Sequence, residues 1–322
     1  MNDPVFDSPI GGVTPSELNR FSPAFVTARA PGKVNLSLRV GGLDQHGYHP
    51  LINVFQAVGV WEEITATPRV DDQIVLTVQG PGARYVPLGE TNLVTRAARA
   101  MQHASGVSDG VNLHIVKGVP VAGGMAGGSA DAAATLVALN ALWRLDLSLE
   151  ELMKIGAPLG ADVPFSLFGG TAVGFGRGDE LTAITDNGQY HWVFALRSRG
   201  LSTADVFARF DELVPAGHEL DESANQGLYE ALERGDVVEV ARHLHNDLQL
   251  PSFDMAPDLH LTVQRAKELG ALAVLLSGSG PTIAVLVSDA DHALMMRDAL
   301  VEAGVCMNAL VASGPVRGAY VV

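Results

Sequence analysis

The fold of this chain is decided by one stretch, Pro120-Val121-Ala122-Gly123-Gly124-Met125-Ala126-Gly127-Gly128-Ser129-Ala130-Asp131-Ala132-Ala133-Ala134. Four glycines fall within six positions, and an alanine-rich run follows at once. Residues 111 to 115, just before it, alternate apolar and polar side chains as a strand does. Apolar residues recur at helical spacing after the glycines, so a helix is predicted to begin near Ser129. The stretch therefore joins a strand to a helix through a glycine-rich loop.

A strand, a glycine-rich loop and a helix in this order are typical of a phosphate site. Glycine has no Cβ, so its backbone can approach an anion closely and adopt positive φ. The helix N-terminus adds unpaired N–H groups and about half a positive charge. The stretch has neither the Gly-x-Gly-x-x-Gly spacing nor the Gly-Lys-Ser/Thr end of a Walker loop. Taken alone, it leaves two interpretations open: a phosphate-binding loop, or a structural loop ending in a helix capped by Ser129.

The composition limits the class of protein. A chain of 322 residues suits two domains or one large one, and 47% hydrophobic with 18% charged residues indicates a globular protein. Its one cysteine, Cys306, excludes an internal disulfide and a cysteine-based metal cluster, which makes a reducing cytoplasm the expected location. The net charge of −15 argues against a nucleic-acid surface, and no apolar run has membrane-spanning length. Local amides, helix ends and single cations must therefore hold any anionic ligand.

Polarity along the chain predicts its organisation. Residues 1 to 24 are polar and lack the basic start and apolar centre of a signal peptide, so we expect a flexible or loosely docked tail. A polar segment from Thr185 to Tyr190 predicts the domain boundary, giving residues 25–185 and 186–322. After residue 257 the pattern predicts a helix, a hairpin, a second helix and a strand, which indicates a ferredoxin-like α+β layer. Single helices are also expected at 92–105 and 228–244, and strands at 26–40 and 61–78.

Three polar sites have structural as well as functional interpretations. Lys33 and Asn35 share the polar face of the strand at 26–40, and by itself such a lysine is usually solvated. Tyr48 and His49 could stack on a base and bind its edge, although a surface loop with incidental aromatic residues is the simpler interpretation. Asp162 precedes a proline of a first helical turn, so it could be a helix cap or a catalytic base.

Separated motifs resemble those of the GHMP kinase superfamily. Residues 31–35, Pro-Gly-Lys-Val-Asn, are similar to its first motif, residues 120–129 to its phosphate loop, and residues 276–282, Leu-Ser-Gly-Ser-Gly-Pro-Thr, to its third motif. Residues 44–49 and 160–165 resemble one branch, the kinases of the non-mevalonate isoprenoid route that act on a cytidine-diphosphate-linked methylerythritol. The resemblance implies an α+β, two-domain GHMP kinase fold, with an N-terminal ribosomal-S5-like α/β domain and a C-terminal ferredoxin-like α+β domain.

The resemblance also implies an activity. It is an ATP-dependent transfer of the γ-phosphoryl group to a hydroxyl of that small-molecule substrate, the 2-hydroxyl in the family, giving the 2-phosphate and ADP. Asp162 would be the base, and Lys33 its electrostatic partner. Mg²⁺ is expected, without an assignable protein ligand. The alternatives are another GHMP small-molecule kinase or a non-catalytic nucleotide-binding regulator. We expect no nucleic-acid or membrane partner, and a monomer or homodimer.

Binding residues follow from the same resemblance. The substrate-binding set is Asn35, Tyr48, His49, Thr203 and Phe207, with Tyr48, His49 and Phe207 at the cytosine. Phe207 departs in its surroundings from the proline-bearing pattern of some family members. Ser129 would lie near the terminal phosphate oxygens or the metal ion. The expected ATP-binding residues are Asn92, Pro120, Val121, Ala122, Gly123, Gly124, Met125, Ala126, Gly127, Gly128, Ser129, Ala130, Gly278, Ser279 and Gly280. Ala126 and Ala130 replace glycine and serine of many relatives, so ordinary φ is expected at both.

Overall fold

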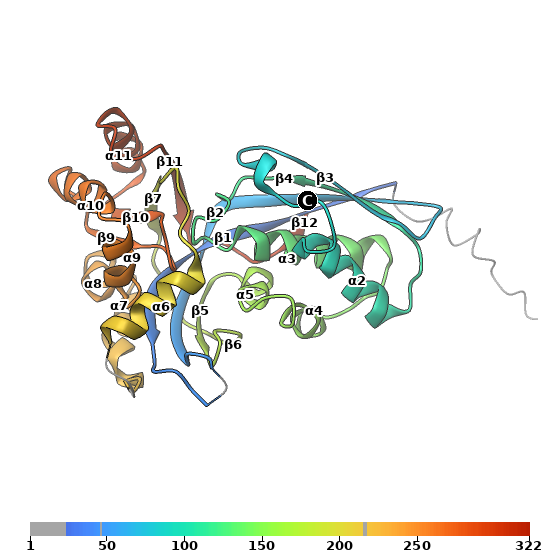
Figure 1. Cartoon of the computed structure of the whole chain (residues 1–322), viewed down its shortest axis with the longest axis horizontal. Coiled ribbons are helices and arrows are strands. Elements are labelled where there is room, and N and C mark those ends of the chain that lie inside the picture. The colour runs from blue at the N-terminus through green and yellow to red at the C-terminus, as the bar shows by residue number, and fades with distance from the viewer. Residues whose placement is uncertain (1–23, 46, 215–217) are drawn as a thin grey trace, which may run out of the picture.

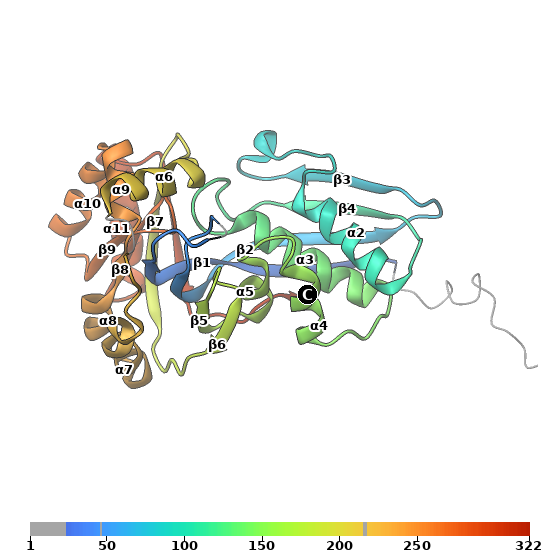
Figure 2. The same cartoon turned by 60° about the horizontal axis from the view of Figure 1, so that its bottom comes forward.

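The computed structural model describes residues 24–45, 47–214 and 218–322. Within these ranges it holds two sheets with helices around them (Figures 1 and 2). The strands are β1 (Val26–Val40), β2 (Leu51–Pro68), β3 (Ile74–Gln79), β4 (Val111–Val116), β5 (Thr171–Phe175), β6 (Glu180–Ala183), β7 (Tyr190–Leu196), β8 (His245–Asn246), β9 (Ala273–Leu276), β10 (Ile283–Val287), β11 (Asn308–Gly314) and β12 (Tyr320–Val321). The helices are α2 (Leu93–Ser105), α3 (Gly127–Leu142), α4 (Leu149–Gly156), α5 (Val163–Phe168), α6 (Thr203–Leu213), α7 (Gln226–Arg234), α8 (Val237–His243), α9 (Gln249–Met255), α10 (Leu259–Glu268) and α11 (Ala290–Glu302).

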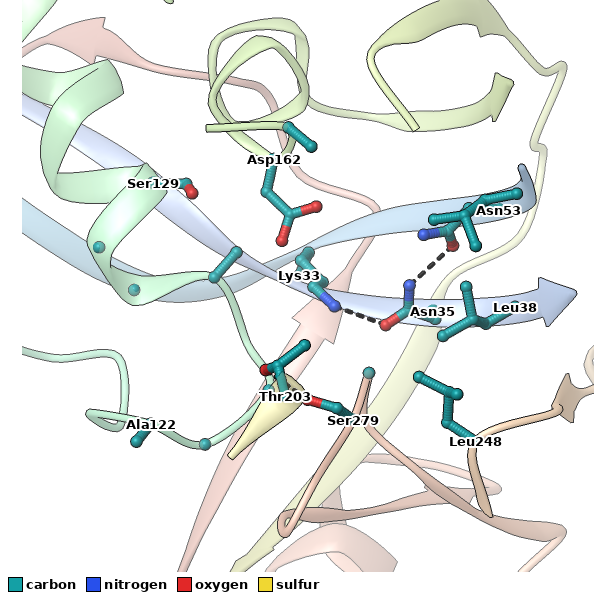
Figure 3. A pocket seen from close by; sticks show the side chains of 18 of the residues that line it. Lys33, Asn35, Leu38, Asn53, Ala122, Ser129, Asp162, Thr203, Leu248 and Ser279 are labelled. Carbon is teal, nitrogen blue, oxygen red and sulfur yellow. Dashed lines mark hydrogen bonds between the residues drawn. The ribbon is translucent and has the colours of Figure 1, made fainter. Parts of the chain in front are cut away.

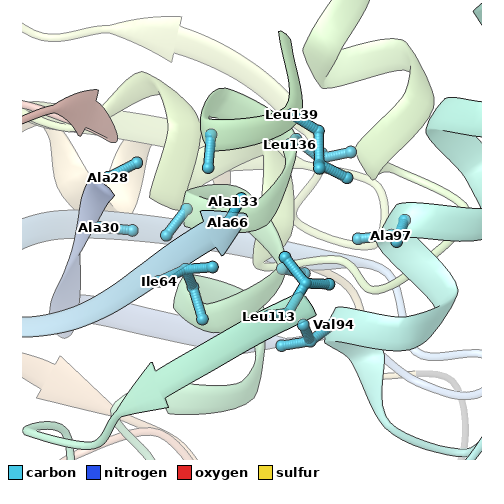
Figure 4. Packing of buried hydrophobic residues seen from close by; sticks show 14 of the residues in the cluster. Ala28, Ala30, Ile64, Ala66, Val94, Ala97, Leu113, Ala133, Leu136 and Leu139 are labelled. Carbon is cyan, nitrogen blue, oxygen red and sulfur yellow. The ribbon is translucent and has the colours of Figure 1, made fainter. Parts of the chain in front are cut away.

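The first sheet has the order β12-β1-β2-β4-β3, with β5 paired to the first half of β2 and β6 paired to β5. The long strands β1 and β2 are antiparallel, and β3 and β4 are parallel. Helices α2 and α3 cover one face of this sheet (Figure 4). Ile64 of β2, Leu113 of β4 and Leu136 of α3 meet there and are at most 1% exposed. Apolar burial between the sheet and α3 thus fixes where the glycine-rich loop begins and ends.

The second sheet has the order β11-β7-β10-β9, with every neighbouring pair antiparallel. This order and the crossover through α11 are those of a ferredoxin-like layer, which confirms the prediction from the sequence. Val34 and Leu36 of β1 pack in one buried cluster with Trp192 and Phe194 of β7. The second sheet therefore covers β1 at Val34 and Leu36, and the polar Lys33 and Asn35 lie on the opposite face of the strand.

The two sheets are connected by more than one crossing of the chain. After β11 the chain returns, and Val321 of β12 pairs with Ala28 of β1. The short strand β8 pairs in parallel with β1 at Ser37. The expected boundary lies between β6 and β7, and the division into 25–185 and 186–322 stays a prediction. The expected tail lies outside the described residues except for Ala24. Among the described helices, none has the length and apolarity needed to cross a membrane.

Most of the elements predicted from the sequence are present, but the predicted bounds of one helix and one strand are wrong. The helix predicted over residues 228–244 is divided into α7 and α8, because Gly235 takes a left-handed conformation with φ of 67° and the Asp236 carboxylate caps α8. The strand expected to start near Trp61 already begins at Leu51. Residues 52–58 are buried on both faces, so their side chains do not alternate in polarity and give no strand pattern.

Candidate active site

A cavity of about 410 Å³ opens between the glycine-rich loop and the polar face of β1 (Figure 3). Residues from the C-terminal half of the chain, which contains the second sheet, form the rest of its wall. Most of the residues predicted from the sequence meet in it. Those lining it are Lys33, Asn35, Pro120, Ala122, Gly123, Gly124, Ala126, Gly127, Gly128, Ser129, Asp162, Thr203, Phe207, Gly278 and Ser279. The three motifs, which are widely separated in sequence, therefore form one site.

Lys33 is buried, contrary to the solvated lysine that its strand position alone favoured. It is 5% exposed, and its ammonium donates a hydrogen bond of 2.5 Å to Oδ1 of Asn35. The Asn35 amide donates in turn to Oδ1 of Asn53 at 2.7 Å. Burial lowers the pKa of Lys33, and the negative charge of Asp162 opposes that shift. The cavity thus contains a cation whose charge is sensitive to what binds beside it.

The Asp162 carboxylate faces the cavity and points toward Lys33 (Figure 3). Asp162 occupies the N-cap position of α5, but its side chain makes no capping hydrogen bond. Val163 and Phe165, at most 1% exposed, anchor the helix and so hold Asp162 at the cavity wall. The interpretation of Asp162 as a mere cap is therefore wrong. The Asp162 carboxylate therefore lies at the cavity wall on the side of a buried cation, without a capping role.

The glycine-rich loop is held between β1 and the third motif. The Lys33 amide donates to the Met125 carbonyl at 3.2 Å, and Ser277 Oγ donates to the Gly124 carbonyl at 3.1 Å. A Cβ at Gly124 would lie only 2.0 Å from the carbonyl oxygen of Ser277, and the φ of Gly124 is 73°. Only glycine fits there. The loop conformation is thus set by tertiary contacts on both sides.

The helix α3 begins one turn earlier than a Ser129 cap would place it. Its N-cap is Ala126, with φ of 60°, and no side chain makes a capping hydrogen bond. The expectation of an ordinary φ at Ala126 is therefore wrong, whereas Ala130 is helical. The physical reason lies next to it: the Met125 side chain is fully buried and its carbonyl is bound by β1, so the chain must reverse at Ala126. Ser129 is left facing the cavity.

The third motif approaches the lysine directly. A Cβ at Gly278 would lie 3.0 Å from Lys33 Nζ. The Asn246 amide holds this turn by donating to the carbonyls of Leu276 and Gly278, each at 2.8 Å. The hydroxyls of Thr203 and Ser279 lie 2.9 Å apart. Ser279 of this turn and Thr203 at the start of α6 therefore present two hydroxyls at the cavity wall opposite Asp162 (Figure 3).

Of the aromatic residues expected at the cytosine, Tyr48, His49 and Phe207, only one lines the cavity. The rings of His49 and Phe207 lie 5.1 Å apart at 32°, and only Phe207 lines the cavity. His49 Nδ1 lies 2.8 Å from the Gly41 carbonyl oxygen. Tyr48 is 53% exposed, and the Arg177 guanidinium stands 5.0 Å from its ring centre. Phe207 and Arg177 thus line the cavity, and Tyr48 is next to it only through its contact with Arg177.

Several expected site residues lie outside this cavity. They are Tyr48, His49, Asn92, Val121, Met125, Ala130 and Gly280. Asn92 caps α2 by accepting a hydrogen bond from the Val94 amide. A Cβ at Gly128 would lie 3.5 Å from Leu93 Cδ1, which places the start of α2 beside the loop. Val121 lines a second cavity, of about 1010 Å³, on the other side of the loop.

Some residues that line the cavity were not expected from the sequence. Asn53 and Arg177 are the polar ones, and Leu38, Leu51, Ala161 and Leu248 also line the cavity. Asn53 is an isolated amide within an apolar run, which is a usable signal for a buried polar contact. Arg177 lies between two glycines in the turn from β5 to β6, and nothing in that pattern indicates a binding role.

Comparison with known proteins gives the family. The family model described as GHMP kinases N terminal domain matches residues 92–170, and that described as GHMP kinases C terminal matches residues 228–306. A 4-diphosphocytidyl-2-C-methyl-D-erythritol kinase of Streptomyces avermitilis is 48% identical over 296 residues, covering 92% of this chain and 99% of the relative. The enzyme of the same name from Rhodococcus jostii is 48% identical over 300 residues, which cover 93% of this chain and 96% of the relative.

Solved structures agree with this relationship. A crystal structure of 4-(cytidine 5'-diphospho)-2C-methyl-D-erythritol kinase superposes with a TM-score of 0.73 at 31% identity, covering 89% of this chain and 98% of the other. A homoserine kinase from Cytophaga hutchinsonii reaches 0.72 at 18% identity, over 99% of this chain and 100% of the other, which shows a shared fold alone. The chain is a two-domain small-molecule kinase that belongs to the GHMP kinases and, within them, to the 4-diphosphocytidyl-2-C-methyl-D-erythritol kinases.

Proposed function

We propose that the protein transfers the γ-phosphoryl group of ATP to the 2-hydroxyl of 4-diphosphocytidyl-2-C-methyl-D-erythritol, forming the 2-phosphate and ADP. The observation that carries this proposal is the meeting of Asp162, Lys33 and the glycine-rich loop in one cavity. The names of the relatives and of the similar crystal structure support the choice of substrate.

The chemistry assigns a role to each side chain. The Asp162 carboxylate takes the proton of the attacking hydroxyl as the new O–P bond forms and the bond to ADP breaks. The Lys33 ammonium stabilises negative charge on the transferring group. Asn35 and Asn53 hold Lys33 in place through their hydrogen-bonded chain. Backbone amides of residues 123–128 and the start of α3 receive the ATP phosphates.

The cytidine diphosphate end of the substrate is assigned to the mouth of the cavity. Phe207 offers one stacking face there, and His49 packs against its ring. The Tyr48 ring lies beside the Arg177 guanidinium, which lines the cavity. A protein of net charge −15 needs a local cation to bind a diphosphate, and the Arg177 guanidinium supplies one at the cavity wall. Thr203, the first residue of α6, offers its hydroxyl to the same end of the substrate, and the Ser279 hydroxyl lies 2.9 Å from it on the third-motif turn.

Mg²⁺ is part of the proposal as the partner of ATP. Among the residues that the structure describes, no group of three or more His, Cys, Asp or Glu side chains is placed to hold a metal ion. This fits an ion that keeps its waters and binds chiefly to phosphate oxygens, as Mg²⁺ does with nucleotides. Action in the cytoplasm, as a monomer or homodimer, completes the proposal.

The test is an assay of the purified protein with ATP, Mg²⁺ and the cytidine-linked methylerythritol. ADP release is followed by a coupled enzyme reaction, and ³¹P NMR identifies the phosphorylated position. Homoserine and mevalonate serve as competing acceptors, because kinases of these substrates share the fold. We expect turnover with the cytidine substrate alone and a monoester at its 2-position. Preferential turnover of another acceptor, or phosphorylation elsewhere, would contradict the proposal.

A further inference from the structure

A buried group of three charged side chains lies directly behind the glycine-rich loop. Glu62 of β2, Lys117 at the end of β4 and Asp131 of α3 meet with the Lys117 ammonium 2.5 Å from an oxygen of each carboxyl. The three side chains are 0–5% exposed. None of them lines the cavity that contains Asp162. The catalytic proposal therefore leaves this charged cluster without a role.

The cluster lies at the end of a buried row of side chains on β2 and β4. Glu63 pairs with Val116 in the register of β2 and β4, so Glu62 and Lys117 stand opposite each other at the next step. Their side chains continue the buried row formed by Ile64 and Ile115. The row is apolar until it reaches the loop and becomes charged there. Removing charged groups from water is costly even when they are paired, so this cluster is a poor general stabiliser compared with apolar packing.

Both ends of the glycine-rich loop contact the same carboxyl group. At the entry, the Gly118 amide donates to Glu62 Oε2 at 3.0 Å. At the exit, a Cβ at Gly127 would lie 3.0 Å from Glu62 Oε1, so this glycine packs against the other oxygen. The Lys117 ammonium joins the same two ends, because it donates to Oδ2 of Asp131 in the first turns of α3 at 2.5 Å.

We infer that Glu62, Lys117 and Asp131 are positioning residues that clamp the entry of the phosphate-binding loop to its exit and so set where the ATP phosphates lie. This inference rests on the proposed role of the loop in binding ATP. In-line phosphoryl transfer is sensitive to displacements of about 1 Å, which is why a clamp behind the loop affects catalysis without touching ATP. Loss of the clamp should therefore weaken nucleotide binding more than binding of the cytidine substrate, since the cytidine side of the cavity is built on other segments.

Three substitutions separate the clamp from general stability. Glu62→Ala removes the acceptor of the Gly118 amide and the contact with Gly127. Glu62→Gln keeps an oxygen for Gly118 at nearly the same volume. Glu63→Ala is the matched control, because Glu63 is the next residue on the same strand and pairs with Arg29 at 2.8 Å on the opposite face, away from the loop.

The measurements are the dissociation constant for ADP by calorimetry, the KM values for ATP and the cytidine substrate, and the melting temperature. Glu62→Ala should weaken ADP binding and raise the KM for ATP by about tenfold or more, with the KM of the cytidine substrate changed less than about threefold. Glu62→Gln should restore ADP binding to within about threefold, and Glu63→Ala should match the wild type. A purely structural role predicts equal losses for both substrates.

Unchanged ADP affinity in folded Glu62→Ala protein would overturn the inference, as would equal loss of both substrates. If Glu62→Ala does not fold, Asp131→Asn replaces it, since it removes the charge at the exit with little change of volume. Asp131→Asn with wild-type ADP affinity would then overturn the clamp. The ADP measurement needs no second substrate. A wild-type protein that binds ADP but does not use the cytidine substrate therefore refutes the proposed acceptor without affecting this test.

Discussion

The Lys33 ammonium donates a 2.5 Å hydrogen bond to Oδ1 of Asn35, two residues further along the same strand face. Because the Asn35 amide then donates to Asn53, the orientation of the whole polar chain is determined. The lysine cannot swing toward solvent without leaving the buried Oδ1 of Asn35 without its donor, which is costly. Lys33 is thus held at the cavity wall, where the proposed reaction places an anionic transition state.

The role of Asp162 is tested by Asp162→Asn. The amide is nearly isosteric but cannot take a proton, so kcat should fall by about 10²–10⁴ while ATP binding persists. Because the Asp162 side chain makes no capping hydrogen bond to α5, the melting temperature should change little. Kinetics with both substrates and a thermal melt check this. A variant within about threefold of the wild-type kcat would exclude Asp162 as the base.

The loop's contact with ATP is best tested at Gly128. A Cβ at Gly127 would meet Glu62 and Val119 in the interior, so a valine there would disturb the core. At Gly128 a Cβ would meet only Leu93, at 3.5 Å, and the residue lines the cavity. Gly128→Val should raise the KM for ATP by about tenfold or more, because its branches block the approach of the phosphates.

Gly128→Ala is the matched control for that substitution. Its Cβ fits without a close contact, so it should alter the KM for ATP far less and leave the melting temperature near that of the wild type. An unchanged KM for ATP in Gly128→Val would place the nucleotide elsewhere.

Cytidine recognition is tested by Tyr48→Ala. Stacking of an aromatic ring on a base contributes about 1–3 kcal/mol, so the KM for the cytidine substrate should rise roughly ten- to a hundredfold. ATP affinity should stay near the wild-type value, because Tyr48 lies outside the loop and is 53% exposed. A uridine analogue should be a poor substrate, since it presents a carbonyl in place of the amino group. Equal losses for ATP and the cytidine substrate would refute the cytosine pocket.

The clamp also predicts a dependence of stability on pH. Burial, with the nearby Asp131 charge, raises the pKa of Glu62 from 4.5 to about 8, and Lys117 opposes the shift. The groups facing Glu62 are Lys117 from β4 and Asp131 from α3, and its partner on β1 is the apolar Ala30. Between pH 4.5 and 8 the folded state holds a proton that the unfolded chain has lost, so the free energy of unfolding falls as the pH rises through that window.

Glu62→Gln checks this prediction, because an amide does not titrate. Urea unfolding at pH 6 and pH 8 should show a smaller loss of stability in Glu62→Gln than in the wild type. Burial raises the pKa of Asp131 to about 6, so a loss of the same sign at lower pH should remain in the variant. Identical pH profiles for wild type and variant would show that Glu62 is not the titrating group.

The sequence by itself determined the family, the order of most elements and the residues of the three motifs. Local patterns sufficed for this: glycines mark where a backbone approaches closely, and the alternation of Val34 and Leu36 with Lys33 and Asn35 assigns the two faces of β1. The Ser148 capping box and the hairpin of β9 and β10 were likewise predictable, because their contacts lie within a few residues of each other.

Only the tertiary structure decided which polar side chains are buried and what they contact. Lys33 looked solvated from its strand position and is buried because the third motif folds over it. Ala126 adopts a positive φ because buried Met125 and β1 force the chain to reverse there. The contact of Lys117 with Glu62 and Asp131 could not be predicted from the sequence, since the three residues come from two strands and a helix whose register is set by apolar packing. Contacts between distant segments depend on that packing, and no local pattern encodes it.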